Sequence, residues 1–215
     1  MNNHRMERCA AAVHKKGAPL TGCWGFIDGT VRLVSRPIVG QEGIYNGHHH
    51  THALKYQAVA MANGMIVSLA GPFVGHDHNM RILAESNLDG NLQAIGNGQA
   101  TNMPINSVYI FGDMGYVISN KIIVPFEGLN LSASQKRFNL EMSRVRECVE
   151  WSYKDVLQYF GFMRDKYNLR TGVSPVGLYY SVACIMTNCH NIFYPNQTSQ
   201  YFDIAPGTID EYIKE

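Results

Sequence analysis

The sequence predicts an α/β fold in which helices pack on the faces of a mixed five-stranded sheet. Three observations lead to this expectation. Short apolar segments of strand length, bounded by Gly, Pro and Asn-Gly turn signals, recur between residues 23 and 126. Residues 132–160 and 175–193 show the apolar spacing of helices. The 215 residues, 46% of them hydrophobic, are enough for one well-buried core, which we take as one domain.

The chain opens with a helical pattern in residues 4–16, where Met6, Cys9 and Val13 share one stripe before Gly17 and Pro19 interrupt it. Residues 24–30 then have the composition of a buried strand that stops at an acid followed by glycine. We therefore expect Asp28 at a strand end.

The next segments predict a hairpin and a helix. Residues 53–61 and 65–69 are strand-like and flank the turn dipeptide Asn63-Gly64, which predicts a hairpin that ends at Gly71-Pro72. Together with the strand that carries Asp28, this hairpin gives three sequential strands, which we expect to be antiparallel. Apolar positions between residues 80 and 88 have helical spacing. Residues 89–106 are rich in Gly and Asn, which predicts a loop.

The second half predicts two more strands and two helices. Residues 108–111 form a short strand that leads to Asp113, and residues 122–126 are edge-like because of their proline. Ser132 and Gln135 have the spacing of a capping box, so a helix is expected from there to about residue 160. A last helix runs from Pro175 to about Phe193, and the tail with its two prolines is expected to be loop. This order of elements is that of a ribonuclease-H-like fold.

Three carboxylates stand on this predicted scaffold and point to a divalent-metal site. Asp28 and Asp113 follow apolar strands, and Glu150 lies within the long helix. Hard cations such as Mg²⁺ and Mn²⁺ take oxygen ligands and keep several waters, so a few carboxylates suffice for a site that also admits a phosphate. Each acid taken singly also fits a structural role, as a turn residue or a solvated helix residue. Together the three predict the site of a polymerase or nuclease.

The long helix holds two rivals of Glu150, and helical geometry separates them. The apolar positions of this helix share a stripe that is expected to face the sheet. Relative to Val149, Glu150 lies about 100° round the axis, Glu147 about 160° away, and Glu141 about 80° to the opposite flank. Glu150 is therefore expected to border the core and Glu147 to face solvent, while Glu141, on the opposite flank and more than two turns earlier, remains a formal rival. The stripe consists of Phe138, Met142, Val145, Val149, Tyr153, Val156 and Phe160.

Composition argues against export and membrane insertion. The five cysteines are odd in number and scattered, which favours a reduced intracellular protein. The apolar run at residues 181–188 is far shorter than the ~20 residues of a membrane span, and the first residues lack the apolar core of a secretory signal. The net charge of +1 is low for a protein that binds phosphates, so nucleic-acid binding would depend on local basic patches.

Three further sets of residues have alternative interpretations. The histidines suggest a zinc site, but they fall in two separate loops without cysteines at zinc-finger spacing, so a structural zinc is the less favoured interpretation. Asp77 is either an accessory metal or DNA contact, or an acid that suits the N-terminus of the following helix. Arg144 and Arg146 are most simply solvated charges, with phosphate contact as the alternative. The histidines are His48, His49, His50, His52, His76 and His78.

Several separate motifs, in order, resemble the DDE endonuclease domain of PIF/Harbinger-type transposases and of their domesticated nuclear relatives. The similarity covers roughly residues 17–202, which leaves residues 1–16 as the remnant of an N-terminal helical region and residues 203–215 as a tail. The motifs are Cys23-Trp-Gly-Phe-Ile-Asp-Gly-Thr-Val-Arg32, Tyr45-Asn-Gly-His48, His52-Ala-Leu-Lys-Tyr-Gln57, Gly71-Pro72, Gly75-His-Asp77, Gly112-Asp-Met-Gly-Tyr116 and Phe138-Asn-Leu-Glu-Met-Ser-Arg-Val-Arg-Glu-Cys-Val-Glu-Trp151.

The resemblance implies a ribonuclease-H-like nuclease in which Asp28, Asp113 and Glu150 bind two divalent ions, Mg²⁺ or Mn²⁺, and cut or join DNA. It implies a nuclear location. Family members usually carry a helical DNA-binding region before the catalytic domain, and here the sequence starts almost directly at that domain. A separate partner, often Myb-like in this family, is therefore expected to help recognise the target. His49 and His50 stand where relatives tend to have Lys or Arg, which predicts weaker phosphate contact near neutral pH. The alternative is a domesticated, catalytically silent module that binds DNA or a protein.

Overall fold

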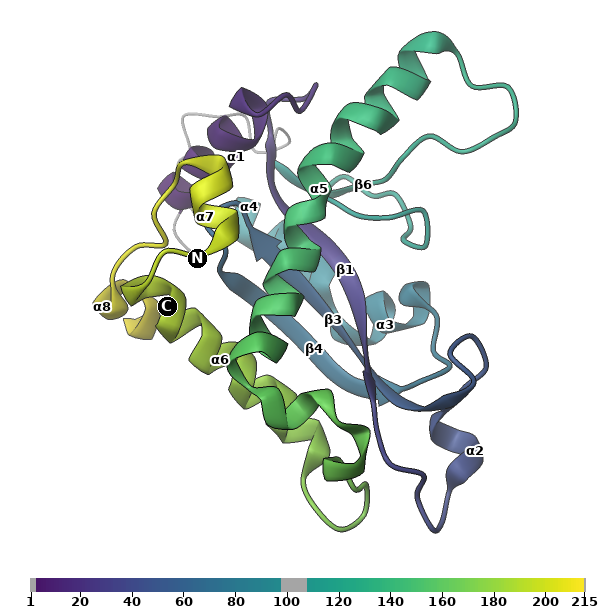
Figure 1. Cartoon of the computed structure of the whole chain (residues 1–215). Coiled ribbons are helices and arrows are strands. Elements are labelled where there is room, and N and C mark those ends of the chain that lie inside the picture. Colours follow the sequence, from purple (N-terminus) through teal and green to yellow (C-terminus); the bar gives the residue numbers. More distant parts are fainter. Residues whose placement is uncertain (1–2, 98–107, 215) are drawn as a thin grey trace.

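The protein folds around a mixed six-stranded sheet, as the computed structural model shows for residues 3–97 and 108–214 (Figure 1). The central strand β1 pairs antiparallel with β3 and parallel with β5. Strand β4 adds to the other side of β3 as an antiparallel neighbour, and β6 adds parallel to β5. The strands are β1 (Cys23–Leu33), β2 (Tyr45–Asn46), β3 (Thr51–Met61), β4 (Ile66–Val74), β5 (Tyr109–Phe111) and β6 (Ile122–Ile123).

This arrangement confirms the predicted ribonuclease-H-like class of fold, with three antiparallel strands followed by two that run parallel to the first. The sheet has one strand more than predicted. The additional strand, β2, is only two residues long. It pairs with the start of β3 and leads into the Asn46-Gly47 turn.

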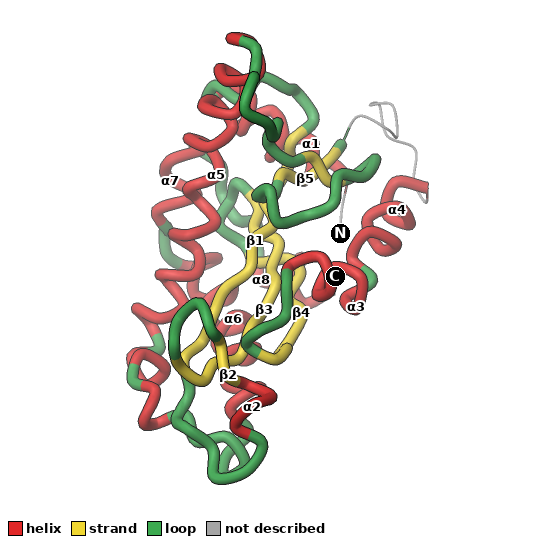
Figure 2. Tube along the Cα trace, turned by 90° about the vertical axis from the view of Figure 1, so that its right-hand side faces the viewer, coloured by secondary structure: helices red, strands yellow, loops and turns green. Residues whose placement is uncertain are grey.

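Helices cover both faces of the sheet. Figure 2 shows α5 and α7 on one side of the strands and α3 and α4 on the other. None of the helices in the described part of the chain combines the length and the hydropathy that a membrane span requires. The helices are α1 (Asn3–Lys15), α2 (Gln41–Ile44), α3 (Asn79–Ser86), α4 (Leu88–Asn97), α5 (Ala133–Tyr159), α6 (Val176–Phe193), α7 (Gln197–Phe202) and α8 (Ile209–Lys214), with 3₁₀ turns at Gly161–Arg164 and Lys166–Asn168.

The long helix α5 begins and packs as its sequence predicts. The Ser132 hydroxyl accepts the Gln135 N–H at 3.3 Å, and the Gln135 side chain accepts the Ser132 N–H at 2.9 Å, so that the capping box is complete. The predicted stripe faces the sheet, with its five central members buried and Phe138 and Phe160 partly buried against the core. The stripe therefore determines which residues of α5 face the sheet and which lie on the two flanks beside that face.

Helix α1 packs into the same core as the strands. The stripe Met6, Cys9 and Val13 is buried, as predicted, on a helix of 13 residues. Arg5 of the same helix forms an ion pair at 3.3 Å with Glu211 of α8, which lies near the other end of the chain. The domain division at residues 16 and 202 stays a prediction.

Three loop predictions were wrong. Residues 88–97 form α4, because Leu88 and Leu92, one helical turn apart, are buried against the core; the remainder of the loop expected at 89–106 lies outside the described residues. Strand β4 continues through Gly71-Pro72 to Val74, paired with β3. The proline-containing tail folds into α7 and α8, of which α7 starts with a capping box from Asn196 and buries Phe202.

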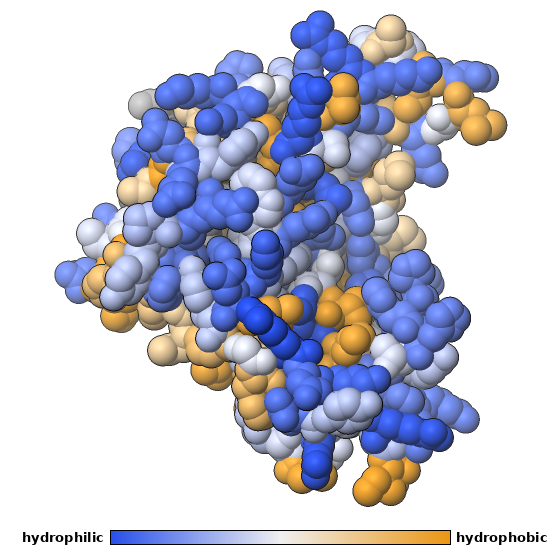
Figure 3. Space-filling model, viewed as in Figure 1, coloured by the Kyte–Doolittle hydropathy of each residue, from blue (hydrophilic) through white to orange (hydrophobic). Residues whose placement is uncertain are grey.

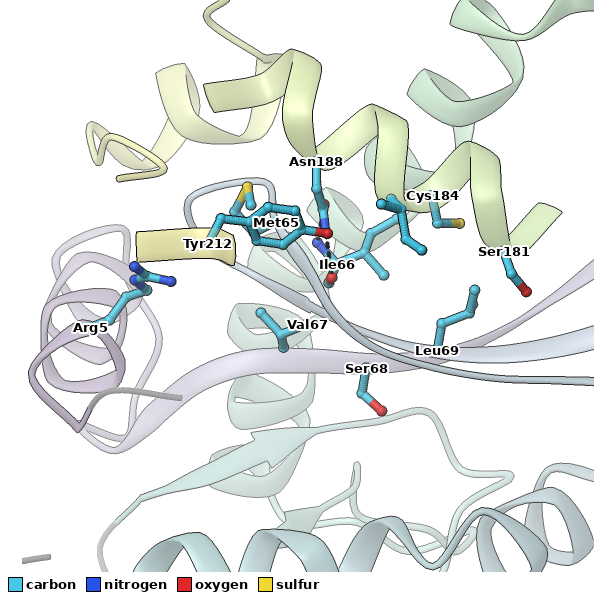
Figure 4. A pocket seen from close by; sticks show the side chains of 11 residues that line it. Arg5, Met65, Ile66, Val67, Ser68, Leu69, Ser181, Cys184, Asn188 and Tyr212 are labelled. Carbon is cyan, nitrogen blue, oxygen red and sulfur yellow. Dashed lines mark hydrogen bonds between the residues drawn. The ribbon is translucent and has the colours of Figure 1, made fainter. Parts of the chain in front are cut away.

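Strand β4 borders the sheet, and helix α6 partly covers it there. The Asn188 amide accepts the Ile66 N–H at 2.9 Å and donates to the Ile66 carbonyl at 2.7 Å, which satisfies backbone groups of this edge strand. Figure 4 shows Asn188 and Cys184 of α6 above residues 65–69, beside a pocket that Arg5 and Tyr212 also line. The face seen in Figure 3 is mostly hydrophilic, with scattered apolar patches.

Candidate metal centre

Asp28 lies in the middle of β1, which corrects the expectation that the strand ends there. Strand β1 continues to Leu33, and its pairing with β3 runs from Gly25 opposite Met61 to Leu33 opposite Ala53. Strand β3, the partner, has eleven residues and continues the pairing past Gly29. The next residues, Thr30 and Val31, are β-branched and therefore favour a strand. Gly29 fits because a Cβ there would lie 2.9 Å from the Asn79 Oδ1 atom.

Asp113 is placed beside Asp28 by the register of two parallel strands. Phe26 of β1 pairs with Phe111 of β5, and each acid follows its phenylalanine by two residues. Strand β5 ends at Phe111, so the chain leaves the sheet next to Asp28. The two carboxylates are close enough that the charge of Asp113 raises the pKa of Asp28.

Glu150 approaches the same region from α5. Arg146, one helical turn before it, donates a hydrogen bond from Nη1 to Asp28 Oδ2 at 3.0 Å, so this flank of α5 faces Asp28. Glu150 is exposed, and its charge also raises the pKa of Asp28. Of its rivals, Glu147 is also exposed, and Glu141 forms an ion pair with Arg137 at 2.7 Å; Glu150 is the acid of this helix whose charge is seen to raise the pKa of Asp28.

The protein itself supplies partners to both aspartates. Asp28 Oδ1 accepts the Gly29 N–H at 2.8 Å, and Tyr153 donates its hydroxyl to the Asp28 backbone carbonyl at 2.6 Å. Asp113 Oδ1 accepts the Gly115 N–H at 2.9 Å and lies 3.5 Å from the Asn79 amide nitrogen. These contacts tie Asp28 to its own strand and to α5, and Asp113 to the loop after β5 and to α3.

Electrostatics at Asp28 reflect a crowded acidic site. Burial is the largest cause that raises the pKa of the Asp28 carboxyl, and Asp113 and Glu150 raise it further. The Arg146 guanidinium and the Gly29 N–H oppose this shift. Because burial dominates, ionised Asp28 is less favourable here than in water.

A lysine lies on the opposite side of the site. Lys55 of β3 donates from Nζ to the Asp77 backbone carbonyl at 2.9 Å. Burial lowers the pKa of Lys55, and the carboxylates of Asp113, Asp77 and Asp28 oppose this. The three predicted acids are thus accompanied by two cations, Arg146 and Lys55.

The chemistry of the donors fits a hard divalent cation. The site offers carboxylate oxygens, and the buried Asn79 Oδ1 atom beside Asp113 has no hydrogen-bond partner. Within the described ranges, however, no group of three or more His, Cys, Asp or Glu side chains is close enough to hold one ion. Metal binding would therefore need side-chain rearrangement, of Glu150 and Arg146 in particular.

Other sequence interpretations turn out differently. The histidine loops lie side by side, since the Asn46 amide donates to the Gly75 carbonyl, yet they form no group that could hold a metal among the described residues. Asp77 is buried and forms an ion pair with Arg81 of α3 at 3.0 Å, which agrees with the helix N-terminal interpretation. Arg144 is exposed, but Arg146 is a partner of Asp28 rather than a solvated charge.

Comparison with known proteins identifies the family of this chain. No curated protein and no solved structure matches the chain. The family model described as DDE superfamily endonuclease matches residues 27–188, well over half of the chain, and the match includes Asp28, Asp113 and Glu150. The chain therefore belongs to the DDE superfamily endonuclease family.

Proposed function

We propose that this chain is the catalytic domain of a metal-dependent DNA endonuclease or transposase of the PIF/Harbinger type, with Asp28, Asp113 and Glu150 as its metal ligands. The observation that supports this most directly is the parallel pairing of β1 and β5, which sets Asp28 and Asp113 side by side in a chain of the DDE family. The motifs that resemble PIF/Harbinger transposases support the subtype, a nuclear location and a separate, Myb-like DNA-binding partner.

Each acid has a defined part in this proposal. Asp28 and Asp113 form the fixed side of the site, because backbone N–H groups and a strand hold them. Glu150 is the adjustable ligand, because it is exposed on the flank of a helix. When two Mg²⁺ or Mn²⁺ ions are bound, they lower the pKa of the attacking water or 3′-hydroxyl and stabilise the leaving oxygen. The protein then needs no nucleophilic side chain.

A second function is favoured by one specific contact. Arg146 already compensates the charge of Asp28, as it would in a catalytically silent module that binds DNA or a protein without metal. The two functions differ in one measurable property, which is metal-dependent cleavage.

The nicking of supercoiled plasmid in Mg²⁺ or Mn²⁺ tests the proposal. We expect wild-type protein to nick the plasmid, and Asp28→Asn and Asp113→Asn each to abolish nicking while the circular dichroism spectrum is unchanged, because each swap removes a ligand charge and keeps the size. Asp210→Asn, the same change on exposed α8, should retain activity. Nicking at the wild-type rate by either site variant would refute the ligand assignment, and no nicking by wild type would favour the silent module.

A further inference from the structure

Both carboxylate oxygens of Asp28 have protein partners. Oδ1 accepts the Gly29 N–H at 2.8 Å, and Oδ2 accepts from Arg146 Nη1 at 3.0 Å. The Gly29 N–H belongs to the neighbouring residue of the same strand and stays in place. A divalent cation that binds Asp28 through Oδ2 therefore takes the position now used by Arg146.

Arg146 is able to leave this position. Its side chain is 23% exposed to solvent, and it reaches Asp28 from α5 through a single hydrogen bond. The hydrogen bond that the structure shows for the Arg146 guanidinium is the one to Asp28. Among the described residues, no other acid forms an ion pair with Arg146. A cation bound between the carboxylates would repel it at short range.

A released arginine beside a nuclease site has an evident ligand. The guanidinium presents its N–H donors in a planar fork that matches two phosphate oxygens, and such charge-assisted pairs are among the stronger hydrogen bonds in proteins. In the proposed function, DNA that is cleaved at Asp28 brings a phosphate within reach of Arg146, which is in contact with Asp28. Arg146 thus has two alternative anionic partners, the Asp28 carboxylate and the DNA backbone.

We propose that Arg146 is an exchangeable counter-ion, which pairs with Asp28 in the metal-free protein and binds a DNA phosphate once a divalent cation occupies Asp28. This rests on the proposed function, because it takes Asp28 as a metal ligand and DNA as the substrate. Since linkage is reciprocal, DNA binding must strengthen cation binding by the same factor by which the cation strengthens DNA binding.

The first test measures the cation alone. The affinity for Mn²⁺, followed by the electron paramagnetic resonance signal of the free ion, is compared among wild type, Arg146→Gln and Arg144→Gln without DNA. Because the competitor is gone, Arg146→Gln should bind Mn²⁺ about 5-fold or more tightly than wild type. Arg144→Gln removes the same charge from an exposed position of the same helix and should stay within about 2-fold. Equal Mn²⁺ affinities of wild type and Arg146→Gln would overturn the proposal.

The second test measures DNA alone, in the presence of a chelator. A fluorescent duplex is titrated with wild type, Asp28→Asn and Asp113→Asn, and fluorescence anisotropy gives the Kd. Both variants lose one negative charge at the site, but only Asp28→Asn releases Arg146, so it should bind about 3-fold or more tightly than Asp113→Asn. Adding Arg146→Gln to each variant should remove the difference. Equal binding by the two single variants would contradict the exchange, and this arm holds even if Arg146→Gln alone fails to fold.

The outcomes are separate from those of the nicking assay. If wild type does not nick DNA but both binding tests succeed, the exchange stands and the endonuclease proposal fails. If Asp28→Asn abolishes nicking but both binding tests fail, the endonuclease stands and Arg146 is only a structural partner of Asp28.

Discussion

At the scale of single residues, Asp28 illustrates the conflict between stability and a charged site. Burial raises the pKa of its carboxyl despite the nearby arginine. The folded protein then holds a proton on Asp28 more readily than the unfolded chain does. The contribution of this group to stability is therefore most favourable below the ordinary carboxyl pKa of about 4 and declines as the pH rises through the raised folded value.

This sign gives a prediction for Asp28→Asn. At pH 7 the neutral amide avoids the cost of the buried charge, so the metal-free variant should melt at a higher temperature than wild type. The gain should shrink as the pH is lowered from 7 toward the ordinary carboxyl pKa of about 4, because the raised pKa of Asp28 lets the wild-type carboxyl take up a proton over this range. Thermal melts in a chelator across this pH range check it, with Asp210→Asn as control. A lower melting temperature of Asp28→Asn at pH 7 would contradict the dominance of burial.

The sequence singled out Asp28 and Asp113 because each follows an apolar segment, and the parallel pairing of β1 and β5 brings the two together, although Asp28 lies inside β1 and not at its end. It did not identify Arg146 as a partner, although the signal was present. Arg146 lies only about 40° round the helix axis from Glu150, so the flank that presents one must present the other. The role of Asn79 had no such signal, because its place beside Asp113 depends on how α3 lies across the sheet.

At the scale of elements, α5 shows how far periodicity can reach. The capping box, the start of the helix and its buried stripe could be predicted, since they depend on local spacing. Helix α4 could not, because its Gly and Asn content argues against a helix and only the burial of Leu88 and Leu92 outweighs it. The continuation of β1 past Asp28 likewise depends on its long partner β3.

The faces of α5 predict which acid completes the site. Glu150→Ala should eliminate metal-dependent nicking, because Glu150 is on the flank that Arg146 shows to face Asp28. Glu147→Ala and Glu141→Ala should stay near the wild-type rate, since Glu147 points to solvent and Glu141 is paired with Arg137 on the surface of the helix. Plasmid nicking by the three variants under one condition makes the comparison. Full activity of Glu150→Ala, or its loss in Glu147→Ala, would move the third ligand elsewhere.

At the scale of the whole molecule, the fold class follows from the order of elements, and the charge balance limits how the protein holds DNA. The basic and acidic residues number 18 and 17. Several cations already pair with acids, and these acids compete with phosphates for them. The ion pairs in the described part of the chain involve Arg5, Lys15, Arg81, Arg137 and Arg146.

We therefore expect weak DNA binding that is sensitive to salt and indifferent to sequence. Each phosphate contact adds about −0.9 to the slope of log Kobs against log salt, so with few cations available the slope should be shallower than about −5. Fluorescence anisotropy titrations from low to physiological salt, with one duplex and its scrambled versions as competitors, measure both properties. Because Arg146 pairs with Asp28 in the metal-free state, the slope should become steeper by about one phosphate in Asp28→Asn. Tight binding to one duplex over its scrambled competitors at physiological salt would instead show that this chain carries its own recognition surface.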